Sequence, residues 1–149
     1  MLGGNQSGTD KVGSGAERPR ARENGMHLQQ GARVLLVAQD PDFGDWLLEE
    51  FKYVGCALAL ATRGQDALSL MGSGLVDVVV AEMSLPDLPG MDLLRELRGM
   101  EKAPKVILTV NRRSDFLVAR AMENGASAVL CKPFRMEQLF AAITRSLAN

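Results

Sequence analysis

Cysteine, histidine and long apolar runs are scarce in this chain, and each scarcity excludes a class of protein. Two cysteines, Cys56 and Cys131, are too few for a disulfide framework or a cysteine-based metal site, and the single His27 has no metal-spaced companion. We therefore interpret both thiols as reduced, small and apolar. No apolar run approaches the roughly 20 residues that cross a bilayer, and the N-terminus lacks the apolar stretch of a secretory signal. These absences predict a cytoplasmic protein without a membrane partner.

A surplus of charge of either sign is also missing, because the formal net charge is -1 at pH 7. Such a chain has no overall field that would attract nucleic acid or anionic lipid. Binding to nucleic acid by this chain alone is therefore disfavoured. The length of 149 residues suits one domain, since single cores are commonly built from roughly 100 to 150 residues.

Residues 1–31 lack any periodic arrangement of apolar side chains and are rich in glycine and polar residues. A segment of this composition cannot bury enough apolar surface to offset the entropy lost on ordering. We therefore expect a flexible tail or linker over residues 1–31 and a single domain over residues 32–149.

From Arg33 onward, short apolar runs alternate with amphipathic stretches of about a dozen residues, the pattern of repeated strand and helix units. Several runs are nearly continuous and β-branched, which is typical of parallel strands covered by helices on both faces. The pattern predicts an α/β fold of five strand–helix units, a doubly wound parallel sheet in three layers. The predicted strands are residues 34–38, 58–61, 76–81, 105–110 and 128–132.

Helix signals fall between these strands. Asp40 before Pro41 is typical of an N-cap followed by the first helical position, and Gly55 marks the end of that helix. Ser114 and Gly125 bracket the fourth helix in the same way. The fifth helix is expected from position 135 to about position 147, because apolar residues recur there at spacings of three and four.

Polar side chains follow several of the predicted strands at their carboxyl ends. Glu82 ends the third strand, Thr109 lies near the end of the fourth, and Lys132 ends the fifth. Ligands of doubly wound sheets bind beyond the carboxyl ends of the strands. We therefore expect a carboxylate, a hydroxyl and an ammonium group to converge at this edge.

Four segments in this order make residues 32–149 resemble the receiver domain of bacterial two-component response regulators: "DPDF", "EMSLPDLPGMDLL", "ILT" and "GASAVLCKPF". The resemblance implies a CheY-like, flavodoxin-like fold with strand order 2-1-3-4-5. It also implies transfer of a phosphoryl group from a partner kinase to an aspartate that ends the third strand. In that family Mg²⁺ is held by this aspartate and by an acidic pair that ends the first strand.

Part of this machinery matches the present sequence. The resemblance assigns Thr109 to the switch hydroxyl and Lys132 to the pocket lysine, and Pro133 then follows a peptide bond that the family usually builds as cis. A hydroxyl and a lysine in these places bind phosphoryl oxygens in the family.

Other parts of the machinery depart from the family pattern. The acidic pair falls on Ala38 and Gln39, the phosphoacceptor position holds Glu82, and the aromatic switch position holds Val129. Asp40 does not replace the pair, because adjacent strand residues point to opposite faces and Asp40 already serves as a helix cap. We expect Mg²⁺ binding to be weak or absent, no other cofactor, and no enzymatic activity.

These departures favour a degenerate receiver, or pseudoreceiver, that acts in signalling without phosphorylation. One hypothesis is that an ion pair between Glu82 and Lys132, with Thr109 nearby, permanently imitates part of the phosphorylated state. The other is that the two groups form a leftover pair that merely satisfies itself. Two further functions stay open, a conventional response regulator phosphorylated on Glu82 and a sensor that binds a small anion or nucleotide through Lys132 and Thr109.

The fourth helix carries the candidate interaction surface. Val118, Ala121, Met122 and Gly125 share one face at helical spacing, which leaves Phe116 exposed on the opposite side. The resemblance places a dimer or effector surface on this helix, the fifth strand and the fifth helix. The expected partner is a kinase, an effector or a second copy in a homodimer, and the polar rim of the surface is supplied by Arg112, Arg113 and Arg120.

Overall fold

A computed structural model of the chain describes residues 31–72 and 76–148. The tail predicted for residues 1–31 lies outside this part except for Gly31, whose amide donates to the Gly55 carbonyl. The domain predicted for residues 32–149 is described apart from the short stretch 73–75 and the last residue. Among the described residues, none of the helices has the length and apolar character needed to span a bilayer.

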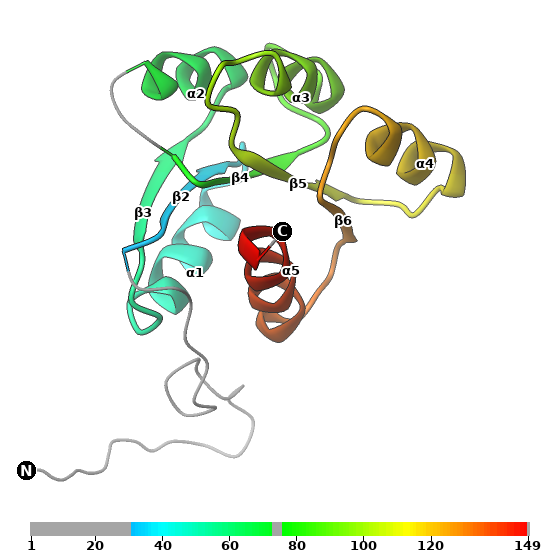
Figure 1. Cartoon of the computed structure of the whole chain (residues 1–149). Coiled ribbons are helices and arrows are strands. Elements are labelled where there is room, and N and C mark those ends of the chain that lie inside the picture. Colours follow the sequence, from blue (N-terminus) through cyan, green and yellow to red (C-terminus); the bar gives the residue numbers. More distant parts are fainter. Residues whose placement is uncertain (1–30, 73–75, 149) are drawn as a thin grey trace, which may run out of the picture.

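Five parallel strands form one sheet in the order β3-β2-β4-β5-β6, which is the predicted order 2-1-3-4-5 (Figure 1). β4 lies at the centre and every residue of it is buried, in agreement with the uninterrupted apolar run that precedes Glu82. The bounds are β2 Arg33–Val37, β3 Ala57–Ala61, β4 Val78–Glu82, β5 Lys105–Val110 and β6 Ala128–Cys131.

Five helices cover the two faces of this sheet, so the predicted three-layer α/β fold is confirmed (Figure 1). Buried residues of α1 and α5 pack with one face of the strands, and buried residues of α2, α3 and α4 pack with the other. Side chains alternate between the faces along a strand, so Val34 and Leu36 contact the first group while Leu35 and Val37 contact the second. The bounds are α1 Pro41–Phe51, α2 Gly64–Met71, α3 Gly90–Arg98, α4 Asp115–Glu123 and α5 Met136–Ala148.

The capping signals in the sequence correspond to observed helix ends. The Asp40 carboxylate accepts a hydrogen bond from the Asp42 amide, and the Ser114 hydroxyl accepts one from the Leu117 amide. Gly55 and Gly125 both adopt positive φ after their helices, which is the conformation that favours glycine. Strand ends differ from the prediction by at most two residues. The strand over 105–110 matches at both ends, and the largest difference is in the central strand, which runs over 78–82 instead of 76–81.

The predicted inward face of α4 is only partly correct. Ala121 is fully buried, whereas Met122 is 47% exposed and was wrongly expected to face the core. β6 is the last strand of the sheet, so α4 covers the margin of the core and has no further strand beneath its outer side. Apolar side chains at helical spacing can therefore stay exposed at this position.

The core on the α1–α5 face depends on large, fully buried side chains of α5. Leu139→Ala removes one of them and should lower the free energy of unfolding by about 2–5 kcal/mol, because the cavity adds to the lost transfer energy. Leu70→Ala on α2 is a matched control, since Leu70 is exposed and its truncation should cost well under half as much. Urea unfolding of both variants measures the difference, and equal losses would contradict this account of the core.

Candidate functional site

Glu82 is the last residue of β4 and lies between the ends of β2 and β5. Its Oε1 accepts a hydrogen bond from the Gln39 backbone amide at 2.6 Å, and its Oε2 pairs with Nζ of Lys132. The side chains of Glu82 and Lys132 are only 11% and 22% exposed, so water screens this ion pair less than it screens a surface pair. Both carboxylate oxygens are thus engaged by groups of the chain itself.

Lys132 follows β6 and has a second partner besides Glu82. Its Nζ lies 4.0 Å from the centre of the Phe43 ring, a position in which the ring attracts the cation. Phe43 in turn packs edge-on against Phe134, with ring centres 5.9 Å apart. The ammonium group therefore contacts both a carboxylate and an aromatic ring. The peptide bond from Lys132 to Pro133 is cis, as the resemblance implied.

Thr109 lies beside Glu82 in the sheet, because the two residues are register partners on β5 and β4. The residue is buried, and its hydroxyl has no hydrogen-bond partner among the residues that the structure describes. An unpaired buried hydroxyl normally costs free energy. The structure thus brings Glu82, Lys132 and Thr109 to one edge, while the hydroxyl stays outside the pair formed by the other two.

The positions of the family's acidic pair hold no carboxylate. Ala38 is buried and its amide donates to the Ala61 carbonyl, while Gln39 takes part through its backbone amide. The Asp40 carboxylate caps α1, as the sequence predicted. Over residues 31–72 and 76–148 there is no cluster of three or more acidic, histidine or cysteine side chains that could hold a metal ion. Mg²⁺ requires several oxygen ligands. Among the described residues, Glu82 supplies the one carboxylate in the family's ligand positions, and both of its oxygens are already engaged, so these residues do not fit a Mg²⁺ site.

Two hollows open on this edge and share Lys132 and Asn111 in their walls. We call the first, of about 310 Å³, the polar hollow; it contains Glu82, Ser84, Thr109 and Arg112. We call the second, of about 500 Å³, the aromatic hollow; it is lined by Phe43, Trp46, Pro133 and Phe134 besides the two shared residues. The Lys132 side chain therefore lines both hollows, the first with several polar side chains among its walls and the second with mainly aromatic ones.

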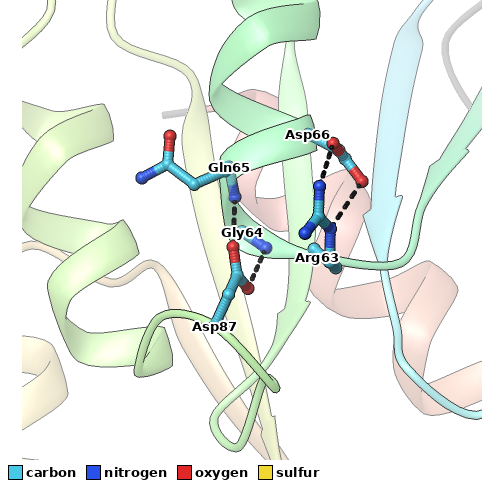
Figure 2. Close-up of polar contacts among 5 residues, drawn as sticks. All are labelled: Arg63, Gly64, Gln65, Asp66 and Asp87. Atoms are coloured by element: carbon cyan, nitrogen blue, oxygen red, sulfur yellow. Dashed lines mark hydrogen bonds and ion pairs between the residues drawn. The ribbon is translucent and has the colours of Figure 1, made fainter.

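The loop between Glu82 and α3 is fastened at both ends. The Gly90 amide donates to the Met83 carbonyl, and a Cβ on Gly90 would lie 2.7 Å from the Glu82 carbonyl oxygen, so a larger residue has no room there. Farther along, the Asp87 carboxylate accepts hydrogen bonds from the amides of Gly64 and Gln65 at 2.8 and 2.9 Å (Figure 2). Asp87 thus caps α2 from a distant loop, since Arg63 at the N-cap position makes no capping hydrogen bond with its side chain.

The remaining sequence-predicted residues lie on or near α4. Phe116 is exposed as predicted, at 68%, and the Arg120 guanidinium lies 5.9 Å from the centre of its ring. Arg112 and Arg113 are exposed just before the helix. Val129 is half-buried on β6 and packs against the core on the α3–α4 face. The structure places these residues, and their roles in binding or switching remain predictions.

Both cysteines are free thiols. Burial raises the pKa of Cys56 to about 11, so this thiol is protonated near neutral pH and is a poor nucleophile. Cys131 is half-buried beside Lys132, and its thiol contacts the Lys132 carbonyl oxygen at 3.5 Å.

Three parts of the site were not predicted from the sequence: the Phe43 ring, the Gln39 amide and the Asp87 cap. Phe43 carries a weak signal, since it is an aromatic residue in the first turn of a helix that begins at the sheet edge. Asp87 could be recognised as a turn residue but not as a cap, because its partners are 22 and 23 residues earlier in the chain.

A doubly wound sheet that gathers a carboxylate, a hydroxyl and a lysine at the carboxyl ends of β4, β5 and β6 belongs to the receiver class of signalling domains. The chain is a member of the response regulator receiver domain family, whose model matches residues 34–144. The resemblance noted in the sequence is thereby confirmed at the level of the family and the fold.

Curated relatives agree with this assignment. The chain is 33% identical over 110 residues to the response regulator MprA of Mycolicibacterium vanbaalenii, with 73% of this chain and 47% of that protein covered. It is 27% identical over 124 residues to the Regulator of RpoS of Escherichia coli K12, with 80% of this chain and 37% of that protein covered. The chain therefore spans about half the length, or less, of these relatives.

Among solved structures, the chain resembles the signal receiver domain of an HD domain-containing protein from Pseudomonas fluorescens Pf-5. The TM-score is 0.74 at 25% identity, and the match covers 80% of this chain and 96% of that domain. The structural match thus extends over nearly the whole of a separately solved receiver domain.

Asp87→Asn tests the cap on α2 through its pH dependence. Hydrogen bonds from backbone amides, that of Gln65 above all and also that of Gly64, hold the pKa of Asp87 below its ordinary value of 3.8. The ionised carboxylate therefore stabilises the fold at pH values above 3.8. This stabilisation is lost as the pH falls through the lowered pKa. We therefore expect wild type to be more stable than Asp87→Asn at pH 6, and the difference to shrink below about pH 4.

Urea unfolding between pH 2.5 and 6 measures this, together with hydrogen exchange of the Gly64 and Gln65 amides, which should be faster in the variant. Asp45→Asn on α1 is the matched control, because Asp45 is an exposed carboxylate outside this contact. A wild-type advantage that is the same at every pH would contradict the capping role.

Proposed function

We propose that this receiver domain works without phosphorylation, as a pseudoreceiver that binds other signalling proteins. The observation that carries the proposal is the engagement of both Glu82 carboxylate oxygens, one by the Gln39 amide and one by the Lys132 ammonium. In the family, a carboxylate at this place attacks the phosphoryl group and also binds Mg²⁺. Here the carboxylate is already neutralised and held inside the pocket.

Charge at the pocket supports the same conclusion. Phosphoryl transfer brings anions together, and a hard cation normally neutralises the charge as it moves. With Ala38 and Gln39 in place of the acidic pair, Glu82 and Lys132 sum to zero formal charge. A divalent cation gains little from such a pocket, so the barrier to phosphoryl transfer stays high.

The ion pair also supports a fixed conformation of the pocket. Glu82 has one more methylene than aspartate, and this additional reach lets its carboxylate contact Lys132, the residue that would otherwise meet the phosphoryl oxygens. The Phe43 ring contacts the same ammonium. We infer that the pair imitates part of the phosphorylated state, which leaves partner binding independent of a kinase.

The binding surface in this proposal is the face formed by α4, β6 and α5. Three large apolar side chains of α4 are more than a third exposed: Phe116, Leu117 and Met122. Exposed apolar side chains with a polar rim are characteristic of protein–protein contacts. Arg112, Arg113 and Arg120 supply that rim.

Restoring the family's residues tests the proposal directly. The wild-type chain of residues 1–149, incubated with acetyl phosphate and Mg²⁺, should gain no phosphoryl group by intact-mass measurement. The triple variant Ala38→Asp, Gln39→Asp, Glu82→Asp should gain one, because it regains the acceptor and the metal ligands together. Glu82→Asp alone is the matched control and should gain little, since the metal ligands are still missing.

A stable gain of one phosphoryl group by wild type, mapped to Glu82, would overturn the proposal in favour of a conventional response regulator. Failure of the triple variant, with its fold intact by circular dichroism, would show that the missing carboxylates are not what prevents phosphorylation.

A second candidate function is the sensing of a small anion or nucleotide. It is favoured by the polar hollow, where Lys132, Arg112 and the unpaired Thr109 hydroxyl come together. A ligand at about 100 times its dissociation constant should stabilise the fold by about 2.7 kcal/mol, which a thermal shift screen detects. Arg112→Gln should abolish the shift if the hollow is the site, whereas a flat response to all nucleotides and oxyanions would exclude this function.

A further inference from the structure

The β3 edge of the sheet is a surface that the proposed function does not use. β3 is the first strand in the sheet order, and Figure 1 draws no helix or strand beyond it among the described residues. It pairs with β2 on one side over five consecutive register positions, without a bulge. Its other side is therefore a free strand edge, with backbone donors and acceptors that face away from the sheet.

The direction of each backbone group on β3 follows from its observed bonds. The Ala57 amide donates to the carbonyl of the residue before β2, and the Ala61 carbonyl accepts from the amide of the residue after β2. Successive residues of a strand point their amide and carbonyl groups to opposite sides. Those of Leu58 and Leu60 therefore point outward, where another strand can pair with them.

This edge carries none of the usual protection against pairing. Proteins normally shield a free edge with charged side chains, proline or a bulge. From position 53 to position 62 the chain has no charged residue and no proline. Ala57 and Ala59 are exposed, so the helices do not cover the strand at these positions. Addition of a further strand is thus permitted by both the side chains and the backbone.

The sequence of β3 indicates which strand would fit. It is Ala-Leu-Ala-Leu-Ala, which is the same in both directions. In an antiparallel pair of two copies centred on Ala59, Leu58 of one copy lies opposite Leu60 of the other. These are the residues whose backbone groups point outward, so each such pair can exchange both of its hydrogen bonds. Every outward donor of the two leucines then meets an acceptor of the second copy.

The side chains suit the same register. Ala59 meets its own counterpart at a non-hydrogen-bonded position, where opposite side chains approach most closely, and alanine is small enough for that approach. Leu58 and Leu60 pack against the core on the α1–α5 face. A two-fold axis perpendicular to the sheet keeps them on that face, so the leucines of the two copies lie side by side.

We propose that β3 of one copy pairs antiparallel with β3 of a second copy, about a two-fold axis at Ala59, so that the two sheets become one. The contact is isologous and closes as a dimer. Five residues on each side are fewer than the roughly 20–30 of a standard stable interface, so the dimer is weak and depends on concentration.

This dimer goes beyond the proposed function because it uses a different surface. β3 and β6 are the two opposite edges of the sheet, so the α4–β6–α5 face stays open in each copy. One assembly then presents two such faces. A bivalent partner gains avidity from both when its spacing matches them.

Sedimentation velocity of the chain of residues 1–149 over a range of concentrations tests the proposal. The weight-average sedimentation coefficient of wild type should rise with concentration. Ala59→Lys should weaken self-association about tenfold or more, because it places two like charges opposite each other at the axis. Ala119→Lys on α4 is the matched control, since it also changes an exposed alanine, and it should behave as wild type.

A monomeric wild type at every concentration would overturn the proposal. Loss of association by Ala119→Lys but not by Ala59→Lys would also overturn it and assign the contact to α4. Circular dichroism of each variant verifies the fold.

A mixture of charge variants separates a direct contact from a disturbed strand. Ala59→Lys and Ala59→Glu should each be monomeric alone, while an equimolar mixture should form a 1:1 pair, because opposite charges then meet at the axis. A mixture that stays monomeric while wild type associates would contradict pairing at Ala59.

Cross-linking through an introduced thiol tests the register. Ala59→Cys should form a disulfide-linked dimer under a mild oxidant, because a non-hydrogen-bonded antiparallel pair brings opposite Cβ atoms close together. Ala57→Cys should not, since its counterpart lies four positions away along the strand, roughly 13 Å. Wild type is the control for the native thiols Cys56 and Cys131 and should stay unlinked. Cross-linking of Ala57→Cys in preference to Ala59→Cys would contradict the register.

These outcomes are separable from those of the proposed function. If wild type stays monomeric yet gains no phosphoryl group in the mass experiment, the pseudoreceiver proposal stands and only the β3 contact fails. If wild type is phosphorylated on Glu82 yet dimerises through Ala59 as described, the reverse holds.

Discussion

The contacts of Glu82 with the Gln39 amide and the Lys132 ammonium determine the charge and the available ligands at the carboxyl ends of the strands. A carboxylate at the end of a fully buried strand must find partners, because an unpaired buried charge is costly. In this chain both partners belong to the protein: the Gln39 amide, which follows β2, and the Lys132 ammonium, which follows β6. The pocket is consequently self-neutralised, and the arrangement of the surrounding loop and helices can be understood from that starting point.

The loop after Glu82 extends this constraint away from the pocket. Gly90 closes the loop against the end of β4, and Asp87 joins it to the start of α2. Leu88 adds an apolar contact, since a Cβ on Gly64 would lie 2.9 Å from that of Leu88. The end of β4 is therefore connected to the start of α2 through the hydrogen bonds of the Asp87 carboxylate and the packing of Leu88 on Gly64.

Sequence patterns predicted the strands well because burial on both faces leaves a plain apolar signal, and β4 shows this most clearly. The meeting of Glu82, Thr109 and Lys132 was predictable too, since parallel topology brings the ends of β4, β5 and β6 to one edge. Contacts that depend on the path of a helix or a loop were not predictable from the sequence. Phe43 on α1 contacts Lys132, which lies 89 positions later in the chain, and Met122 is exposed on the helix beside the last strand of the sheet, β6. Neither feature can be predicted from the local spacing of apolar residues.

The hydrogen bond from Gln39 to Glu82 determines which side chains position 39 can hold without disturbing the pocket. Because the donor is a main-chain amide, any residue except proline at position 39 preserves it. A change of side chain at position 39 therefore leaves this bond to the carboxylate in place, whereas a change at Lys132 removes the donor itself.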